Sequence, residues 1–160
     1  QAEEKGEQPF LVALDGITDP QNLGAIVRSA EVLGAHGVVI LKRRSASMTA
    51  AACKTACGAE EYIPIARVNN LAAAIDEVKE RGVWVAAADM DGQDAFGADL
   101  TGALMLVIGA EGEGVSRLVK ERCDFTVRIP VRGHVESLNA SAAAAVLLYE
   151  KVRQDAEKKK

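Results

Sequence analysis

The strongest constraint on the fold of this chain is a series of short apolar runs that contain almost no polar residues. The runs are rich in β-branched residues and do not alternate, which is typical of strands buried on both faces of a sheet. Five of them are "FLVAL" at 10–14, "GVVIL" at 37–41, "VWVAAA" at 83–88, "LMLVIG" at 104–109 and "FTVRIP" at 125–130. A sixth candidate, "YIPIA" at 62–66, contains Pro64 and would therefore lie at an edge of the sheet.

Helical patterns separate several of these runs. The segment 22–33 places its apolar residues on one face and is followed by Gly34, and the segment 70–82 ends in the same way at Gly82. Two more helices are expected, at 114–123 and 138–152. Strands that alternate with helices predict an α/β fold, in which a parallel sheet carries helices on both faces.

The length of 160 residues is that of one ordinary domain. We expect a linker-like segment at 1–8, the folded domain at 9–153 and a charged flexible tail at 154–160. The first ten residues, "QAEEKGEQPF", are polar and acidic, which argues against a secretory signal. Their linker character leads us to expect a further domain upstream.

Composition limits the possible partners. Hydrophobic residues make up 49% of the chain and charged residues 26%, which predicts a packed core. No apolar run reaches the roughly 18–20 residues of a membrane span, so no membrane partner is expected. The three cysteines fit a reducing compartment, and we expect a cytoplasmic protein. The net charge of −4 gives no general attraction for nucleic acid, so RNA binding would depend on local basic clusters.

Two segments have a superficial likeness to metal sites. Cys53 and Cys57 have no second pair and no nearby histidine, so we interpret them as small buried residues. The segment "DMDGQD" at 89–94 lacks the spacing and the late glutamate of a calcium loop, and we interpret it as a turn. We therefore expect no metal.

Three loops that follow predicted strands are rich in glycine, asparagine and acidic residues. They are "DGITDPQNLGAIVR" at 15–28, "GAEGEGVS" at 109–116 and "IPVRGHVESLNAS" at 129–141. Ligands of open parallel sheets bind beyond the carboxyl ends of the strands, so we expect the functional site where these loops meet. Taken alone, the periodicity favours a solvated Arg28 over a functional one, and Asn22 could be only part of a turn and helix cap.

The combination of these loops is more specific than its parts. Asn22, Gly24 and Arg28 in the first loop, "IGAEGEG" in the second and "IP…G…SLN.S" in the third resemble the three motifs of the SpoU-type RNA ribose 2′-O-methyltransferases. The resemblance spans about residues 10–150, and "CGAEEYIPIARVNNL" at 57–71 is similar to the branch that methylates a guanosine of 23S ribosomal RNA. A transfer-RNA ribose methyltransferase and a non-catalytic module that retained the fold to bind RNA remain alternatives.

The resemblance implies a particular form of the fold and a particular cofactor. Members of this family have a C-terminal deep trefoil knot, which pattern reasoning alone would not propose. They bind S-adenosylmethionine, the methyl donor, in the knotted loops. The implied cofactor-binding residues here are Gly109, Ile129, Leu138, Glu111, Gly112 and Pro130.

The resemblance also implies catalytic residues. Arg28 has the central role, either as a general base or as a group that stabilises the developing alkoxide or anchors a phosphate. Glu111 is expected to orient Arg28, while Asn22, Ser137 and Asn139 are expected to position the ribose and the loop. Ser and Asn are also common helix caps, so a purely capping role for Ser137 and Asn139 stays open.

RNA and a second copy of the chain are the expected partners. The basic cluster Lys42, Arg43 and Arg44, together with Arg28 and Arg132, provides the candidate RNA contacts, although a solvated loop would explain the cluster as well. The family is dimeric through its first and last helices. A partner would explain why the helix 138–152 is apolar on every side, and burial within one subunit is the alternative.

Overall fold

The computed structural model describes residues 2–159, which contain a six-stranded sheet with the order β3-β2-β1-β5-β4-β6. Every pair of neighbouring strands is parallel. The strands are β1 (Phe10–Asp15), β2 (Gly37–Leu41), β3 (Ile65–Val68), β4 (Trp84–Asp94), β5 (Leu104–Gly109) and β6 (Phe125–Arg128). The predicted parallel sheet is confirmed, and the run that contains Pro64 leads into an edge strand.

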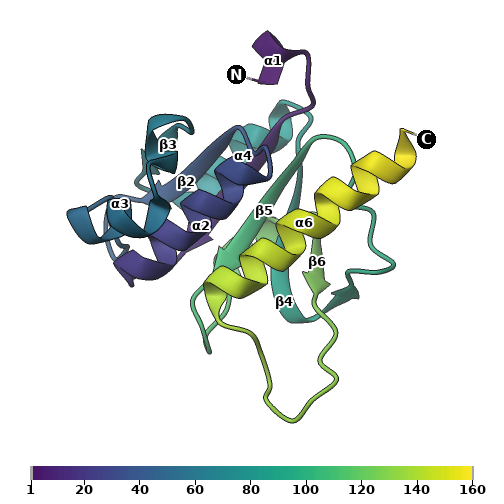
Figure 1. Ribbon diagram of the computed structural model, residues 1–160. Helices are drawn as coiled ribbons and strands as arrows, with labels where there is room; N and C mark the ends of the chain where they lie inside the picture. Colours follow the sequence, from purple (N-terminus) through teal and green to yellow (C-terminus); the bar gives the residue numbers. More distant parts are fainter. Residues whose placement is uncertain (1, 160) are drawn as a thin grey trace.

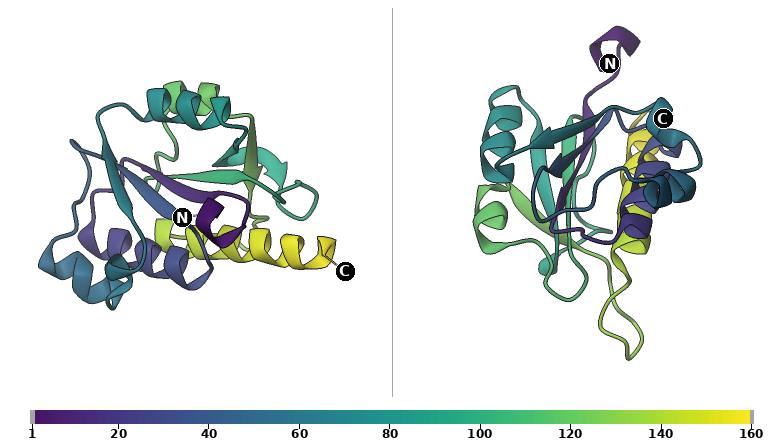
Figure 2. Two further views of the ribbon diagram at one scale, coloured as in Figure 1. Left: turned by 90° about the horizontal axis from the view of Figure 1, so that it is seen from above. Right: turned by 90° about the vertical axis from the view of Figure 1, so that its left-hand side faces the viewer.

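Helices cover both faces of this sheet, as predicted (Figures 1 and 2). One face carries α2, α3 and α6, and the other carries α4 and α5. The helices are α1 (Ala2–Lys5), α2 (Pro20–Val32), α3 (Ala50–Ala56), α4 (Leu71–Glu80), α5 (Arg117–Arg122) and α6 (Ala140–Lys158), with a 3₁₀ turn η1 at Ala59–Glu61. None of the helices within residues 2–159 is long and apolar enough to cross a membrane.

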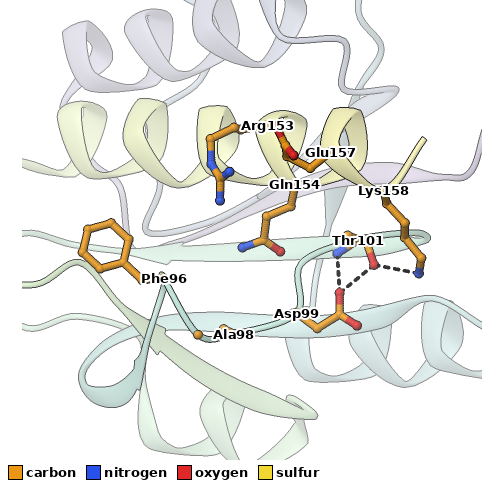
Figure 3. A pocket seen from close by; sticks show the side chains of 9 residues that line it. Phe96, Ala98, Asp99, Thr101, Arg153, Gln154, Glu157 and Lys158 are labelled. Atoms are coloured by element: carbon orange, nitrogen blue, oxygen red, sulfur yellow. Dashed lines mark hydrogen bonds between the residues drawn. The ribbon is translucent and has the colours of Figure 1, made fainter. Parts of the chain in front are cut away.

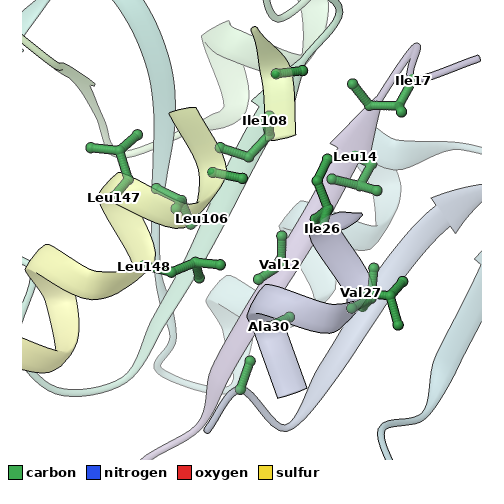
Figure 4. Close-up of a cluster of buried hydrophobic side chains, with 14 of the residues drawn as sticks. Val12, Leu14, Ile17, Ile26, Val27, Ala30, Leu106, Ile108, Leu147 and Leu148 are labelled. Carbon is green, nitrogen blue, oxygen red and sulfur yellow. The ribbon is translucent and has the colours of Figure 1, made fainter. Parts of the chain in front are cut away.

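The larger hydrophobic core lies between the central strands and the helices α2 and α6. Figure 4 shows how β1 and β5 face the two helices through Val12, Leu14, Leu106, Ile108, Ile26, Val27, Leu147 and Leu148. Full burial of one such aliphatic side chain stabilises a fold by about 1.5–3 kcal/mol relative to exposure. The core therefore fixes α2 and α6 side by side on one face.

Helix α2 begins where the sequence provides both a cap and a proline. The side chain of Asp19 accepts a hydrogen bond from the backbone N–H of Gln21 at 2.9 Å, and Pro20 is the first helical residue. Four residues later, Gly24 packs against α3 so closely that a Cβ there would lie 2.3 Å from the carbonyl oxygen of Ala52. Gly24 therefore sets the distance between α2 and α3.

The two ends of the described chain are more ordered than predicted. Residues 2–5 of the expected linker form the short helix α1, and the carboxylate of Glu7 lies 3.1 Å from Nε2 of the buried His36. The expected flexible tail from 154 onward is helical through Lys158. It is anchored because Gln154 accepts a hydrogen bond from the N–H of Leu100 at 2.8 Å, a long-range contact that local charge does not reveal.

Two further predictions were wrong. The segment 89–94 is the end of β4 and not a turn, because it pairs with β6 around a bulge in which Val127 faces both Ala88 and Gln93. Cys57 is exposed in a left-handed conformation after α3, and Cys53 is only half-buried. Neither cysteine belongs to the buried core.

Candidate active site

The loops that follow the strands gather beyond the carboxyl edge of the sheet, and two bridges hold them together. The N–H of Ser116, after β5, donates to Oδ2 of Asp15, at the end of β1, at 2.7 Å. The N–H of Ala46, after β2, donates to the carbonyl oxygen of Ile17 at 2.8 Å. The loops after β1, β2 and β5 therefore form one unit. Sequence reasoning missed Asp15, whose only signal is an acidic residue at the end of a buried strand.

The loop after β5 is a tight turn that only glycine permits. The N–H of Gly114 donates to the carbonyl oxygen of Ala110 at 2.7 Å, and Gly112 and Gly114 have φ values of +83° and +68°. A Cβ on Gly109 would lie 2.1 Å from the carbonyl carbon of Gly114. Gly109 is thus required for the loop to fold back on β5, while Glu111 and Gly112 are exposed at its tip.

The loop 129–139 projects beyond the sheet and leads into α6 (Figure 1). Asn139 is the cap of this helix, because its side-chain oxygen accepts hydrogen bonds from the N–H of Ala142 at 2.8 Å and from the hydroxyl of Ser141 at 3.1 Å. Ser137 and Leu138 are exposed. A capping role had been left open for both Ser137 and Asn139. Asn139 caps α6, whereas Ser137 forms no cap hydrogen bond within residues 2–159.

Asn22 and Arg28 lie on the same helix, α2, but at different positions along its axis. Asn22 is half-buried in the first turn of α2, and Arg28 is exposed six residues later, about 9 Å further along the helix axis. Within residues 2–159, the Arg28 guanidinium forms no hydrogen bond or ion pair. The expected contact between Arg28 and Glu111 is therefore not formed within one copy of the chain.

An apolar hollow of about 450 Å³ lies beside α6 and contains only part of the predicted cofactor set. Ile129 and Pro130 line it together with Tyr149 and the rim residues Arg132 and Glu150. Hydrogen bonds from Arg153 hold the pKa of the Glu150 carboxyl below its ordinary value. Gly109, Glu111, Gly112 and Leu138 lie outside the lining of this hollow.

A second, more polar hollow of about 380 Å³ separates the segment 96–101 from the C-terminal half of α6 (Figure 3). Its floor is ordered by Asp99, which accepts hydrogen bonds from both the N–H and the hydroxyl of Thr101, and Lys158 donates to the same hydroxyl. The bonds from Thr101 lower the pKa of Asp99. No residue predicted for the site lines this hollow.

Apart from Arg28 on α2, the predicted RNA contacts lie on two loops of the carboxyl edge. Lys42, Arg43 and Arg44 are exposed after β2, where Arg44 adopts a left-handed conformation with φ of 55°, and Arg132 is exposed after β6. Among residues 2–159, no three His, Cys, Asp or Glu side chains are grouped so that they would hold a metal ion.

A parallel sheet with glycine-rich and polar loops gathered at its carboxyl edge defines a ligand-binding α/β protein as a class. The model of the SpoU rRNA Methylase family matches residues 9–149 of the chain. The chain belongs to the SpoU rRNA methylase family.

Two relatives show how far this similarity extends. The chain is 52% identical over 154 residues to YacO of Bacillus subtilis, a protein of the TrmH tRNA/rRNA methyltransferase family, and covers 62% of it. It is 48% identical over 150 residues to the 23S rRNA (guanosine-2′-O-)-methyltransferase RlmB of Escherichia coli and covers 61% of it. The alignments take in 96% and 92% of this chain. The chain thus spans about three fifths of the length of these relatives.

Solved structures share the fold. The SpoU methyltransferase AviRb from Streptomyces viridochromogenes, in complex with AdoMet, matches with a TM-score of 0.85 and 35% identity over 92% of this chain and 61% of AviRb. The A. aeolicus TrmH/SpoU tRNA modifying enzyme matches with a TM-score of 0.86 and 28% identity over 96% of this chain and 78% of that enzyme.

Proposed function

We propose that this chain transfers a methyl group from S-adenosylmethionine to the ribose 2′-hydroxyl of an RNA nucleotide, with a guanosine of 23S ribosomal RNA as the favoured target. The observation that carries the proposal is that three distant motifs, at 15–28, 109–116 and 129–141, follow strands of one parallel sheet and so lie at its carboxyl edge, where a hydrogen bond from Ser116 to Asp15 joins the first two. RlmB, whose name states this substrate, supports the choice of RNA, and the AdoMet complex of AviRb supports the methyl donor.

The residues at the carboxyl edge fit a bulky nucleoside ligand. Gly112 and Gly114 carry no side chains in the turn after β5, so a ligand can approach the backbone at these two positions. Ile129 and Pro130 offer apolar surface at the start of the loop after β6, and Leu138 offers more at its end, 47% exposed. We assign the adenine to these apolar side chains and the remainder of the donor to the backbone of 109–112. The bound donor supplies a methyl group on a positively charged sulfur.

Methyl transfer requires that the ribose 2′-hydroxyl be oriented toward the methyl group more than it requires activation of the donor. The 2′-oxygen attacks the methyl carbon, the carbon–sulfur bond breaks with its electron pair moving to sulfur, and the hydroxyl proton leaves to solvent or a nearby base. The free guanidinium of Arg28 is suited to bind the adjacent phosphate or the developing alkoxide, because a guanidinium holds its proton firmly. Asn22, Glu111, Ser137 and Asn139 are assigned to positioning the ribose and the loops.

A second copy of the chain completes this proposal. Tyr149 and Val146 on α6 are 60% and 44% exposed, and Val32 at the end of α2 is 70% exposed. Three apolar side chains on the two helices that the family resemblance assigns to the dimer support a homodimer through α2 and α6. The partner would cover the side of α6 that faces away from the sheet.

The proposal includes the trefoil knot. Its support is the path of the chain, which leaves the outer strand β6, passes through 129–139 and returns as α6 to contact the segment 95–102, which connects β4 to β5. Joining the two ends of the chain covalently and then denaturing it tests the topology. A knotted ring is more compact than an unknotted ring of equal length and would migrate faster on a denaturing gel.

Methyl transfer tests the activity directly. Labelled S-adenosylmethionine is incubated with the chain and either ribosomal or transfer RNA, and nuclease digestion identifies the product nucleotide. Label in 2′-O-methylguanosine of ribosomal RNA is expected. Label only in transfer RNA would show that transfer RNA, and not ribosomal RNA, is the substrate. This outcome is tested because the similar A. aeolicus protein is a tRNA modifying enzyme. RNA binding without cofactor binding would favour the non-catalytic module.

A further inference from the structure

One side of the molecule carries an excess of basic side chains. Residues 28–67 contain six basic and three acidic residues, in a chain whose net charge is −4. Within the described part of the chain, no ion pair or side-chain hydrogen bond engages these basic residues, which are Arg28, Lys42, Arg43, Arg44, Lys54 and Arg67. On the opposite face, by contrast, basic side chains of α4 and α5 are paired with carboxylates, as Lys79 is with Asp124 and Lys120 with Asp89.

Several of these groups follow the outer edge of the sheet. β3 pairs only with β2, and Arg67 lies opposite Ile40 in that pairing. The N–H of Lys42 donates to the carbonyl oxygen of Val68 at 2.9 Å, so the basic loop starts beside the end of β3. Tyr62, 73% exposed, stands just before β3. Figure 1 shows β3, β2 and α3 together on this side of the molecule.

We define the β3 strip as the exposed residues Tyr62 and Arg67, before and on β3, and Lys42, Arg43 and Arg44, in the loop that begins beside the end of β3. The strip runs from the start of β3 to the carboxyl edge. At the carboxyl edge, the hydroxyl of Ser45 and the N–H of Ala46 both donate hydrogen bonds to the carbonyl oxygen of Ile17, in the loop that precedes α2. A ligand on the strip would therefore extend toward the loop that precedes α2, at the candidate active site.

We propose that the β3 strip binds the single-stranded RNA that flanks the target nucleotide. The inference rests on the proposed function and extends the predicted RNA contacts at Lys42, Arg43 and Arg44 to Tyr62 and Arg67, for which the family motifs assign no role. Unpaired Lys and Arg side chains bind backbone phosphates, and an exposed aromatic ring stacks on an unpaired base. A ribose 2′-hydroxyl reaches an enzyme most readily when its nucleotide is splayed out of a duplex, so the flanking strand is single.

A peptide strand added to the free edge of β3 is the competing occupant. β3 is only four residues long, follows Pro64 and carries the charged Arg67. Short length, proline and charge are the features by which natural edge strands resist pairing with another chain. The charge and the exposed ring favour RNA over peptide.

The test compares two strip variants with two matched controls. Arg67→Gln and Tyr62→Leu remove a charge and a ring from the strip. Arg81→Gln and Trp84→Leu remove an exposed arginine just before β4 and a 60% exposed aromatic residue at its start, with three strands between β4 and β3. Binding of a short fluorescein-labelled single-stranded RNA is measured over a range of salt concentrations, together with binding of S-adenosylmethionine and thermal unfolding.

Arg67→Gln is expected to reduce the slope of log affinity against log salt by about 0.7, the value for one phosphate contact on a single strand. Tyr62→Leu is expected to weaken binding roughly tenfold at an unchanged slope. All variants should unfold and bind S-adenosylmethionine like the wild type, and both controls should bind RNA like it.

Strip variants that bind RNA as tightly as the controls would overturn the inference and leave the proposed activity intact. Equal affinity for duplex and single-stranded RNA would overturn the single-strand assignment. Failure of the proposed function has a different signature, because the wild type itself would then neither bind S-adenosylmethionine nor transfer its methyl group.

Discussion

At the scale of single residues, Gly109 is the glycine whose surroundings leave the least space for a side chain. Gly109→Ala would place a methyl group 2.1 Å from the carbonyl carbon of Gly114, so the turn must open. We expect a loss of roughly 1–3 kcal/mol in the free energy of unfolding and at least tenfold weaker binding of S-adenosylmethionine. Calorimetry measures both. The control is Gly97→Ala, between β4 and β5, whose Cβ would meet only the carbonyl oxygen of Asp94 at an ordinary 3.9 Å. Equal behaviour of the two variants would contradict the account.

Asn139 has two roles that substitution can separate. Its side chain caps α6 through the N–H of Ala142, and losing a cap costs about 1 kcal/mol of stability. Asn139→Ala should therefore lower both stability and methyl transfer. Asn139→Asp retains a capping oxygen and should recover stability, while its negative charge beside the donor and ribose should leave methyl transfer impaired. Full recovery of transfer in Asn139→Asp would show that the residue only caps the helix.

At the scale of elements, the C-terminal half of α6 is held by a buried charge. Lys151 is 2% exposed and donates to the carbonyl oxygen of Gly102 at 2.8 Å and to Asp155 at 2.5 Å. Removing one member of such a pair leaves the other buried and uncompensated. We expect Asp155→Ala to cost about 2–3 kcal/mol in urea unfolding, because Asp155 itself remains partly exposed. Asp91→Ala, at an exposed site, is the control and should change little.

The elements that the sequence predicts well are those whose environment is uniform along their length. The runs at 37–41 and 104–109 coincide with β2 and β5, because strands buried on both faces need apolar residues at every position. The end of β4 was missed because its polar residues pair with β6, which lies more than thirty residues away. The last turns of α6 were missed for the same reason, since their stability comes from the segment 95–102.

In the candidate site, too, some features could be predicted from the sequence and others could not. The motif positions could be identified from the sequence, because they follow strands whose carboxyl ends must share one edge. Their mutual contacts could not. Spacing along the chain does not reveal that Gly109 accommodates Gly114, that Asp15 binds the loop after β5, or that Arg28 stays free of Glu111 within one copy. These contacts depend on how separate elements are packed.

At the scale of the whole molecule, the uncovered side of α6 predicts self-association. The wild type should have twice the chain mass of 16.9 kDa by light scattering. Tyr149→Asp should shift it toward the monomer, because a carboxylate would be buried at the interface between two apolar surfaces. Trp84→Asp changes an equally exposed aromatic residue at the amino edge and should leave the mass unchanged. A monomeric wild type, or a Tyr149→Asp variant of full dimer mass, would contradict the proposed interface.

The central claim is that the carboxyl edge of this sheet methylates RNA with the help of Arg28. The most direct measurement is single-turnover transfer of labelled methyl from S-adenosylmethionine to unmodified 23S ribosomal RNA by the wild type, Arg28→Ala and the surface control Arg81→Ala. We expect label in 2′-O-methylguanosine for the wild type and the control. Arg28→Ala should be slower by at least a hundredfold, with unchanged affinity for the methyl donor, because Arg28 acts on the RNA. Equal rates for Arg28→Ala and Arg81→Ala, or no transfer by a wild type that binds donor and RNA, would contradict the claim.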